Sequence, residues 1–211
     1  MILIHQVNTF ALTSCHRINS SHLEAMQNAP SLEAGKILLS EPFMDDPNFK
    51  RSVVVLCEHK AEGTLGFIIN KSLNMKLSEA IPDLDAFAGN LYFGGPVETD
   101  TLHFLHTLGE ELEGSVEVAP GLWWGGNFEI LSILIKSGQV GPEDVRFYLG
   151  YAGWSPGQLA DELDSQSWIG HSGKTDYIFN REDDALWRNI LREKGGKYRV
   201  MSNYPEDPSY N

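Results

Sequence analysis

The chain has 211 residues, of which 42% are hydrophobic and 21% are charged. This length and apolar content suffice for a hydrophobic core, so disordered, collagenous and coiled-coil architectures are excluded for the chain as a whole. The formal net charge of −13 argues against a protein that holds phosphate backbones over a broad face. No segment approaches the roughly 20 consecutive apolar residues of a membrane-spanning helix, so no membrane association is expected.

The acidic residues are concentrated in one part of the sequence. From Lys76 to Gly170 there are 15 Asp and Glu against 3 Lys and Arg, so this stretch carries −12 and the rest of the chain carries −1. Two interpretations remain open. The more common one is a solvated acidic surface that aids solubility, and the other is a docking face for a basic partner.

The two cysteines are too few for a disulfide framework. Cys57 follows an apolar run, which is typical of a buried, reduced thiol. Cys15 lies in a sequence that superficially matches a lipoprotein processing site, but no Lys or Arg precedes it and polar residues interrupt the apolar stretch. We therefore expect a cytoplasmic protein in a reducing environment.

The chain divides into three parts that differ in composition and hydrophobic periodicity. Residues 1–34 hold few charges and no sustained periodicity, which predicts a poorly structured N-terminal extension. Met26 is an alternative start, so residues 1–25 need not belong to the native protein. Residues 35–202 are expected to form one domain. The polar, proline-bearing tail 203–211 is expected to fray.

The domain is expected to contain short strands and a few helices. Apolar segments predict strands, in chain order, at 36–40, 51–58, 67–70, 91–93, 102–106, 115–119, 122–124 and 145–151. Helical periodicity and cap residues predict helices at 77–87, 127–137, 156–163 and 183–194. Tight glycine turns favour antiparallel pairing, and the helices are too few for a regular βαβ array. The fold class is therefore α+β with a mostly antiparallel sheet.

Residues 153–157 match the G-x-S-x-G motif of a hydrolase nucleophile. However, Pro156 follows the serine and has no backbone N–H to donate to an oxyanion hole. Ser155 is better interpreted as a helix N-cap, with Gln158 reaching back to complete a capping box. No catalytic residue is assigned.

The sequence gives no pattern for a metal or a cofactor. His103 and His106 point to opposite faces of a strand, so they are a poor pair of metal ligands. The glycine pairs match neither a Walker A loop nor a complete G-x-G-x-x-G. The segment 125–127 opens a helix whose free N–H groups could hold a small anion, but an ordinary cap is the more common use. We expect no metal and no cofactor.

One basic segment near the C-terminus is the candidate for nucleic-acid binding. Glu193 and the acidic residues at 182–184 dilute its charge, and part of it follows the solvent face of an amphipathic helix. No helix-turn-helix signature accompanies it, so direct nucleic-acid binding is disfavoured. The segment consists of Arg188, Arg192, Lys194, Lys197 and Arg199.

An ordered series of motifs runs between about residues 35 and 168: GKILLSEP (35–42), FKRSV (49–53), EH (58–59), GTLGFIINK (63–71), FGGPV (93–97) and LGYAGWSPGQL (149–159). Together these motifs resemble the AlgH/YqgE family of bacterial proteins. Ser72 stands where that family often has a proline after its Asn-Lys pair. The resemblance implies a single α+β domain whose bent sheet forms a pseudo-barrel with helices packed outside. It also implies the label of transcriptional regulator and supplies no established catalytic residues.

We therefore expect a protein that binds a protein or a small ligand and affects transcription only indirectly. One alternative is an enzyme on a small metabolite that uses Glu58 and His59 as an acid–base pair. Another is a DNA-binding regulator. The polar residues at strand ends and helix starts, where a barrel-like sheet presents a pocket, are the ligand-binding candidates. They are Arg51, Glu58, His59, Asn70 and Gln158.

Overall fold

The computed structural model describes residues 32–179 and 183–206, so nearly all of the expected extension 1–34, with Cys15 and Met26, lies outside the described residues. The strands are β1 (Ile37–Ser40), β2 (Val53–Lys60), β3 (Gly63–Ile68), β4 (Ser72–Lys76), β5 (Asn90–Phe93), β6 (Val97–His106), β7 (Val116–Ala119), β8 (Leu122–Trp124), β9 (Val145–Trp154) and β10 (Trp168–His171). The helices are α2 (Leu77–Ala80), α3 (Phe128–Lys136), α4 (Gln158–Asp164), α5 (Thr175–Phe179), α6 (Asp183–Lys194) and α7 (Gly196–Met201), with short 3-10 helices η1 (Pro82–Leu84) and η2 (Gly109–Glu111).

The strands form one ten-stranded sheet in the order β10-β1-β2-β3-β9-β6-β8-β7, to which β5 is added beside β9 and β4 beside β5. The β5–β9 pair is parallel, and the other recorded pairs are antiparallel. The prediction of an α+β fold with a mostly antiparallel sheet is confirmed. The pseudo-barrel that the family resemblance implied is wrong. Among the described strands, β10 pairs with β1 and β7 with β8, but the edge strands β10 and β7 do not pair with each other, so the sheet is not closed into a barrel.

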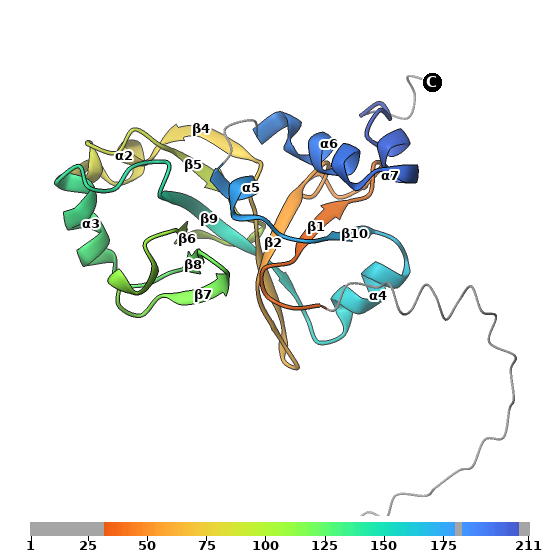
Figure 1. Ribbon diagram of the computed structural model, residues 1–211, viewed down its shortest axis with the longest axis horizontal. Coiled ribbons are helices and arrows are strands. Elements are labelled where there is room, and N and C mark those ends of the chain that lie inside the picture. Colours follow the sequence, from red (N-terminus) through yellow and green to blue (C-terminus); the bar gives the residue numbers. More distant parts are fainter. Residues whose placement is uncertain (1–31, 180–182, 207–211) are drawn as a thin grey trace, which may run out of the picture.

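The helices are few and short: α2 and α3 lie at one end of the molecule, α4, α6 and α7 lie toward the other, and α5 lies near the middle (Figure 1). At one end, α2, η1 and α3 pack with β5, β6 and β9 around an apolar cluster that includes Leu131, Phe104 and Phe147. At the other end, α6 lies beside β1 and β2 and contributes Leu186 and Trp187 to a second cluster. Within the described residues no helix combines the length and apolar character needed to cross a membrane.

Strand β2 is apolar because both of its faces are buried. Its residues Val53 and Val55 belong to the cluster beneath α6, whereas Val54 and Leu56 belong to a third cluster with α4. Cys57 is 4% exposed and unpaired, and burial raises the pKa of its thiol, as expected for an inert core cysteine.

The longer predicted helices are present. Asn127 caps α3 by accepting hydrogen bonds from two backbone N–H groups, and α6 spans the predicted range 183–194. The helix predicted at 77–87 is divided at Pro82, which begins η1 instead of continuing α2. The sequence patterns did not predict the short elements β4, β10, α5 and α7, which have four to six residues each.

Strand β9 changes partners at a point where two glycines meet. Its first half pairs with β5 and β6, and its last residues pair with β3. At the change, Gly150 has φ +67°, and a Cβ atom there would lie 2.5 Å from the carbonyl oxygen of Gly95. A Cβ on Gly95 would in turn overlap the Tyr151 backbone. Both positions therefore require glycine for close backbone approach, which accounts for two of the sequence motifs.

We expect Gly150→Ala to lower the free energy of unfolding by about 3 kcal/mol or more, because positive φ and backbone overlap both act. Gly138→Ala is the matched control, since Gly138 has φ +71° but nothing within 4 Å of the new Cβ. The control should lose only about 1 kcal/mol. Urea denaturation of both variants measures the difference, and equal losses would contradict the packing role of Gly150.

Candidate functional site

Two of the predicted site residues, Arg51 and Asn70, lie together at the start of β2. The Asn70 amide accepts a hydrogen bond from the Val53 N–H at 2.8 Å and donates one to the Arg51 carbonyl at 3.0 Å. These bonds hold Arg51 in the left-handed region, at φ 51°. Asn70 therefore fixes the chain that enters β2, so its amide already has a structural task.

The Arg51 side chain joins the C-terminal segment to the sheet. Its guanidinium lies 4.8 Å from the centre of the Trp187 ring and donates to the Tyr204 carbonyl at 2.6 Å. The Tyr204 ring stacks on Phe43 with centroids 5.6 Å apart. Tyr204, in the expected tail, therefore contacts the domain, and residues 207–211 lie outside the described residues.

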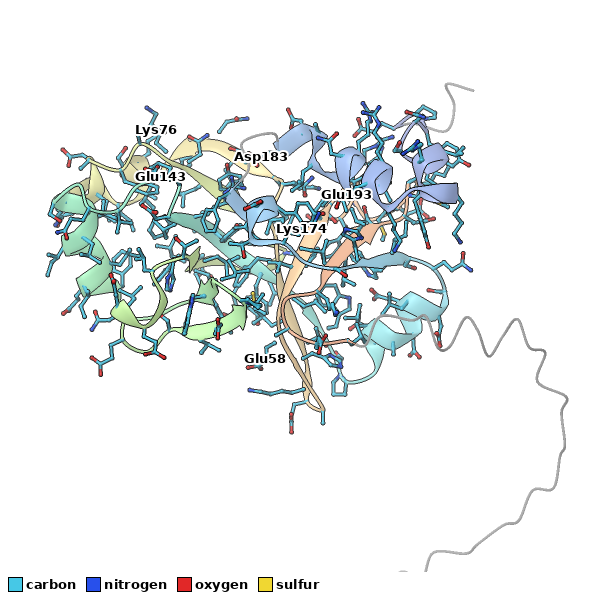
Figure 2. All side chains as sticks on the ribbon, in the orientation of Figure 1. Glu58, Lys76, Glu143, Lys174, Asp183 and Glu193 are labelled. Carbon is cyan, nitrogen blue, oxygen red and sulfur yellow. The ribbon has the colours of Figure 1, made fainter. Side chains whose placement is uncertain are left out.

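Glu58 and His59 lie at the opposite end of β2, in the hairpin that projects from the molecule (Figure 2). Glu58 accepts a hydrogen bond from Lys60 at 2.6 Å, and His59 Nδ1 lies 2.7 Å from the Thr64 hydroxyl. Adjacent strand residues point to opposite faces, so Glu58 and His59 do not face each other. Arg51 is eight positions away, roughly 25 Å along an extended strand. The proposed acid–base pair thus has no shared site with Arg51.

Gln158 lies in the first turn of α4, and its side chain is used locally. Its amide oxygen accepts the Ser155 N–H at 2.9 Å, and its amide nitrogen donates to Glu162 at 2.8 Å. The predicted bond from Gln158 back to Ser155 is confirmed, but the prediction that Ser155 is the N-cap is wrong, because Gly157 holds that position with φ 79°. Glu162 also accepts the indole N–H groups of Trp154 and Trp168. The motif at 154–158 therefore positions α4.

An open hollow of about 430 Å³ lies between the projecting hairpin and the end of β9. Of the five predicted residues, Glu58 alone lines it, and its carboxylate is paired with Lys60. The structure thus places the candidates in three separate groups: Arg51 with Asn70, Glu58 with His59, and Gln158.

The two strand histidines are structural. His106 is fully buried, and its Nδ1 accepts the Leu108 N–H at 3.2 Å, so its Nε2–H donates to the Gly125 carbonyl at 2.9 Å. The His103 ring packs against Phe67 and Trp124. Burial lowers the pKa of both imidazoles. No group of three or more metal-ligating side chains occurs in residues 32–179 and 183–206.

A buried charged centre, absent from the sequence predictions, lies where β5, β9 and α6 meet. Arg146 is 5% exposed, and its Nη1 donates to the Ile69 carbonyl at 3.0 Å and to Asp183 at 3.1 Å. Its guanidinium lies 4.2 Å from the centre of the Tyr92 ring. The Tyr92 hydroxyl donates to the other Asp183 oxygen at 2.9 Å. We call Arg146, Tyr92 and Asp183 the Arg146 centre.

Local structure explains how these residues meet. The parallel pairing of β5 with β9 places Tyr92 opposite Tyr148, two residues beyond Arg146. Asp183 is the first residue of α6, where the helix dipole favours a carboxylate. The Tyr148 hydroxyl is buried with no hydrogen-bond partner among the described residues, and burial raises its pKa, so it stays neutral at physiological pH.

A cavity of about 330 Å³ opens on the Arg146 centre, within the range of small-molecule sites. A more polar hollow of about 700 Å³ adjoins it and shares Asn90 and Asp183 with it. Figure 2 shows Asp183 between the two ends of the molecule, at the start of α6. Besides the Arg146 centre, the cavity is lined by Phe87, Ala88, Gly89, Asn90, Pro142, Val145 and Phe179.

Sequence reasoning missed the Arg146 centre because its members are distant in the chain. Asp183 is 37 residues from Arg146, so no local spacing connects them. The available signal was an arginine in the otherwise apolar strand 145–149, since a charge there must be paired when the strand is buried.

We expect Asp183→Ala to lower the free energy of unfolding by about 3 kcal/mol, because it removes the carboxylate facing a buried guanidinium. Asp184→Ala is the matched control, as Asp184 is the next residue of the same helix and is exposed. It should cost less than about 1 kcal/mol. Chemical denaturation measures both, and similar losses would show that the ion pair contributes nothing beyond the helix dipole.

The lowered pKa of His106 predicts a loss of stability in acid. The folded state favours the neutral ring, so the free energy of unfolding should fall as the pH drops below about 6.5, the value in unfolded chains. His106→Gln should reduce this slope by up to about 1.4 kcal/mol per pH unit. Urea titrations between pH 5 and 7 measure the slope, and an unchanged slope in the variant would overturn the assignment.

Comparison with known proteins places the chain in one family. The model of the family described as AlgH-like matches residues 37–199. A UPF0301 protein of Chlorobaculum parvum is 46% identical over 180 residues, which are 85% of this chain and 96% of the relative.

A UPF0301 protein of Cytophaga hutchinsonii is 43% identical over 181 residues, covering 85% of this chain and all of the relative. The solution structure of the AlgH protein from Pseudomonas aeruginosa has a TM-score of 0.66 at 28% identity, with 85% of this chain and 97% of that chain covered. The crystal structure of a Corynebacterium diphtheriae protein has a TM-score of 0.71 at 20% identity, covers 86% and 97% of the two chains, and supports the fold. The chain belongs to the AlgH-like family.

Proposed function

We propose that this protein is a binding module for a small polar ligand, and that the ligand occupies the cavity above the Arg146 centre. The observation that carries the proposal is a buried guanidinium, paired with a carboxylate, at the floor of a cavity of ligand size. Such sites combine apolar walls with a few fixed polar groups.

Stability alone is a weak reason for a charged pair at this position. Replacing a buried ion pair with packed apolar residues is often neutral or stabilising. Here the pair lies next to the buried core residues Phe87 and Val145, so apolar packing is available at this position. The retained charges therefore support a role in recognition.

The charge distribution supports an indirect effect on transcription. Residues 77–144, which we call the acidic lobe, carry twelve Asp and Glu against one Lys. In the basic segment, Lys194 donates to the Gly170 carbonyl and Arg192 to Asn203. Neither surface suits a broad contact with phosphate backbones. Six of the ten residues that line the cavity belong to the acidic lobe, so the lobe offers a site for a small ligand as well as a charged surface.

A screen of neutral and charged metabolites by thermal shift and ligand-observed NMR tests the proposal. Ala88 is exposed and lines the cavity, so Ala88→Trp should fill the cavity and abolish binding. Ala86 is exposed two residues earlier and is not among the lining residues, so Ala86→Trp is the matched control and should bind normally.

A screen with no binder would contradict the proposed function. If a ligand binds the Ala88→Trp variant as tightly as the original chain, it binds at another site, and the assignment of this cavity is contradicted.

A further inference from the structure

We infer that the ligand of this cavity is a neutral polyol of monosaccharide size, held by hydroxyl groups that donate to Asp183, and that Asp183 excludes anions from Arg146. This inference names the ligand class and rests on the proposed function.

The charges at the floor of the cavity are already matched. Among the described lining residues, Arg146 and Asp183 are the charged ones, and they pair at 3.1 Å. An anion approaching Arg146 would be repelled by the Asp183 carboxylate, and it could take the place of that carboxylate only by displacing it. Displacement would leave a partly buried carboxylate without its cation, which is strongly unfavourable.

A cationic ligand meets the opposite obstacle. The Arg146 guanidinium lies at the floor and repels it, while the negative charge of Asp183 is already compensated by Arg146 and by the Tyr92 hydroxyl. The floor therefore gives neither sign of charge a net attraction at close range.

The hydrogen-bonding groups instead suit hydroxyls. Among the described residues, each Asp183 oxygen accepts one hydrogen bond, from Arg146 or from Tyr92, and has a further lone pair. The Asp183 side chain is 17% exposed, so these acceptors are reachable. The exposed Asn90 amide, at the join with the adjoining hollow, can both donate and accept.

The smaller, apolar part of the lining suits the other surface of such a ligand. Most of the exposed lining is polar, and Phe87, Val145 and Phe179 contribute rings and methyl groups to the remainder. A cyclic polyol presents C–H groups on its faces and hydroxyls on its edge, so it can meet the walls and the floor together. The volume of about 330 Å³ limits the ligand to roughly the size of a monosaccharide or a slightly larger molecule.

Three isosteric probes test the inference: glucose, glucuronate and glucosamine. Saturation-transfer NMR and isothermal calorimetry on the full chain measure their affinities near pH 6.5, where glucuronate is anionic and glucosamine cationic. Glucose should bind at least about tenfold more tightly than either charged analogue. Ala88→Trp should abolish its binding, and Ala86→Trp should not.

Asp183→Asn tests the role of the carboxylate. It removes the negative charge beside Arg146 and one acceptor oxygen, so glucose should bind more weakly and glucuronate about tenfold more tightly than to the original chain. Asp184→Asn is the control and should change neither affinity by as much as threefold. Circular dichroism shows whether Asp183→Asn folds. If it does not, the order of the three affinities for the unmodified chain still tests the neutral-polyol inference.

The outcomes separate the two proposals. Binding of glucuronate or glucosamine in the cavity as tightly as glucose, blocked by Ala88→Trp, would overturn the neutral-polyol inference and leave the proposed function standing. If no probe binds while the broader screen finds a charged ligand in the cavity, the neutral-polyol inference is again overturned and the proposed function stands. If no compound binds there, both proposals fail.

Discussion

The close contact between the backbones at Gly95 and Gly150 is the constraint on which the sheet depends. It lets β9 pair with β5 and β6 along its first half and with β3 at its end. A side chain at either glycine would separate these strands. Because of this change of partners, one strand spans both ends of the molecule, placing Arg146 beside β5 and Trp154 beside the hairpin.

The Arg146 centre uses that arrangement to join elements that are distant in the chain. Its members come from β5, β9 and the first residue of α6, and the guanidinium also holds the carbonyl of Ile69, which follows β3. A buried charge requires compensation, so the helix and the sheet must meet at this point. The same pairing forms the floor of the cavity in which we propose that a ligand binds.

The sequence predicted what local patterns determine. Asn127 and the apolar stripe of α6 identified the two longest helices, and the apolar run of β2 identified a strand buried on both faces. Short elements such as β10 were missed because their strand geometry depends on pairing with distant residues. The candidate site shows the same limit: polar residues at strand ends were selected, but the Arg146 centre depends on a contact across 37 residues that no local spacing reveals.

The uneven distribution of charge along the molecule affects how the protein approaches charged surfaces. The acidic lobe, at one end of the long axis, faces away from the α6–α7 end, where residues 183–201 hold five Arg and Lys against three Asp and Glu (Figure 1). The molecule therefore has a permanent electric dipole along its length. In a field it experiences a torque, so a charged surface orients it before contact, over a range of about 8–10 Å at physiological salt. The protein then meets a charged surface with one end first. The cavity, which lies near the middle of the long axis, faces sideways in such an encounter.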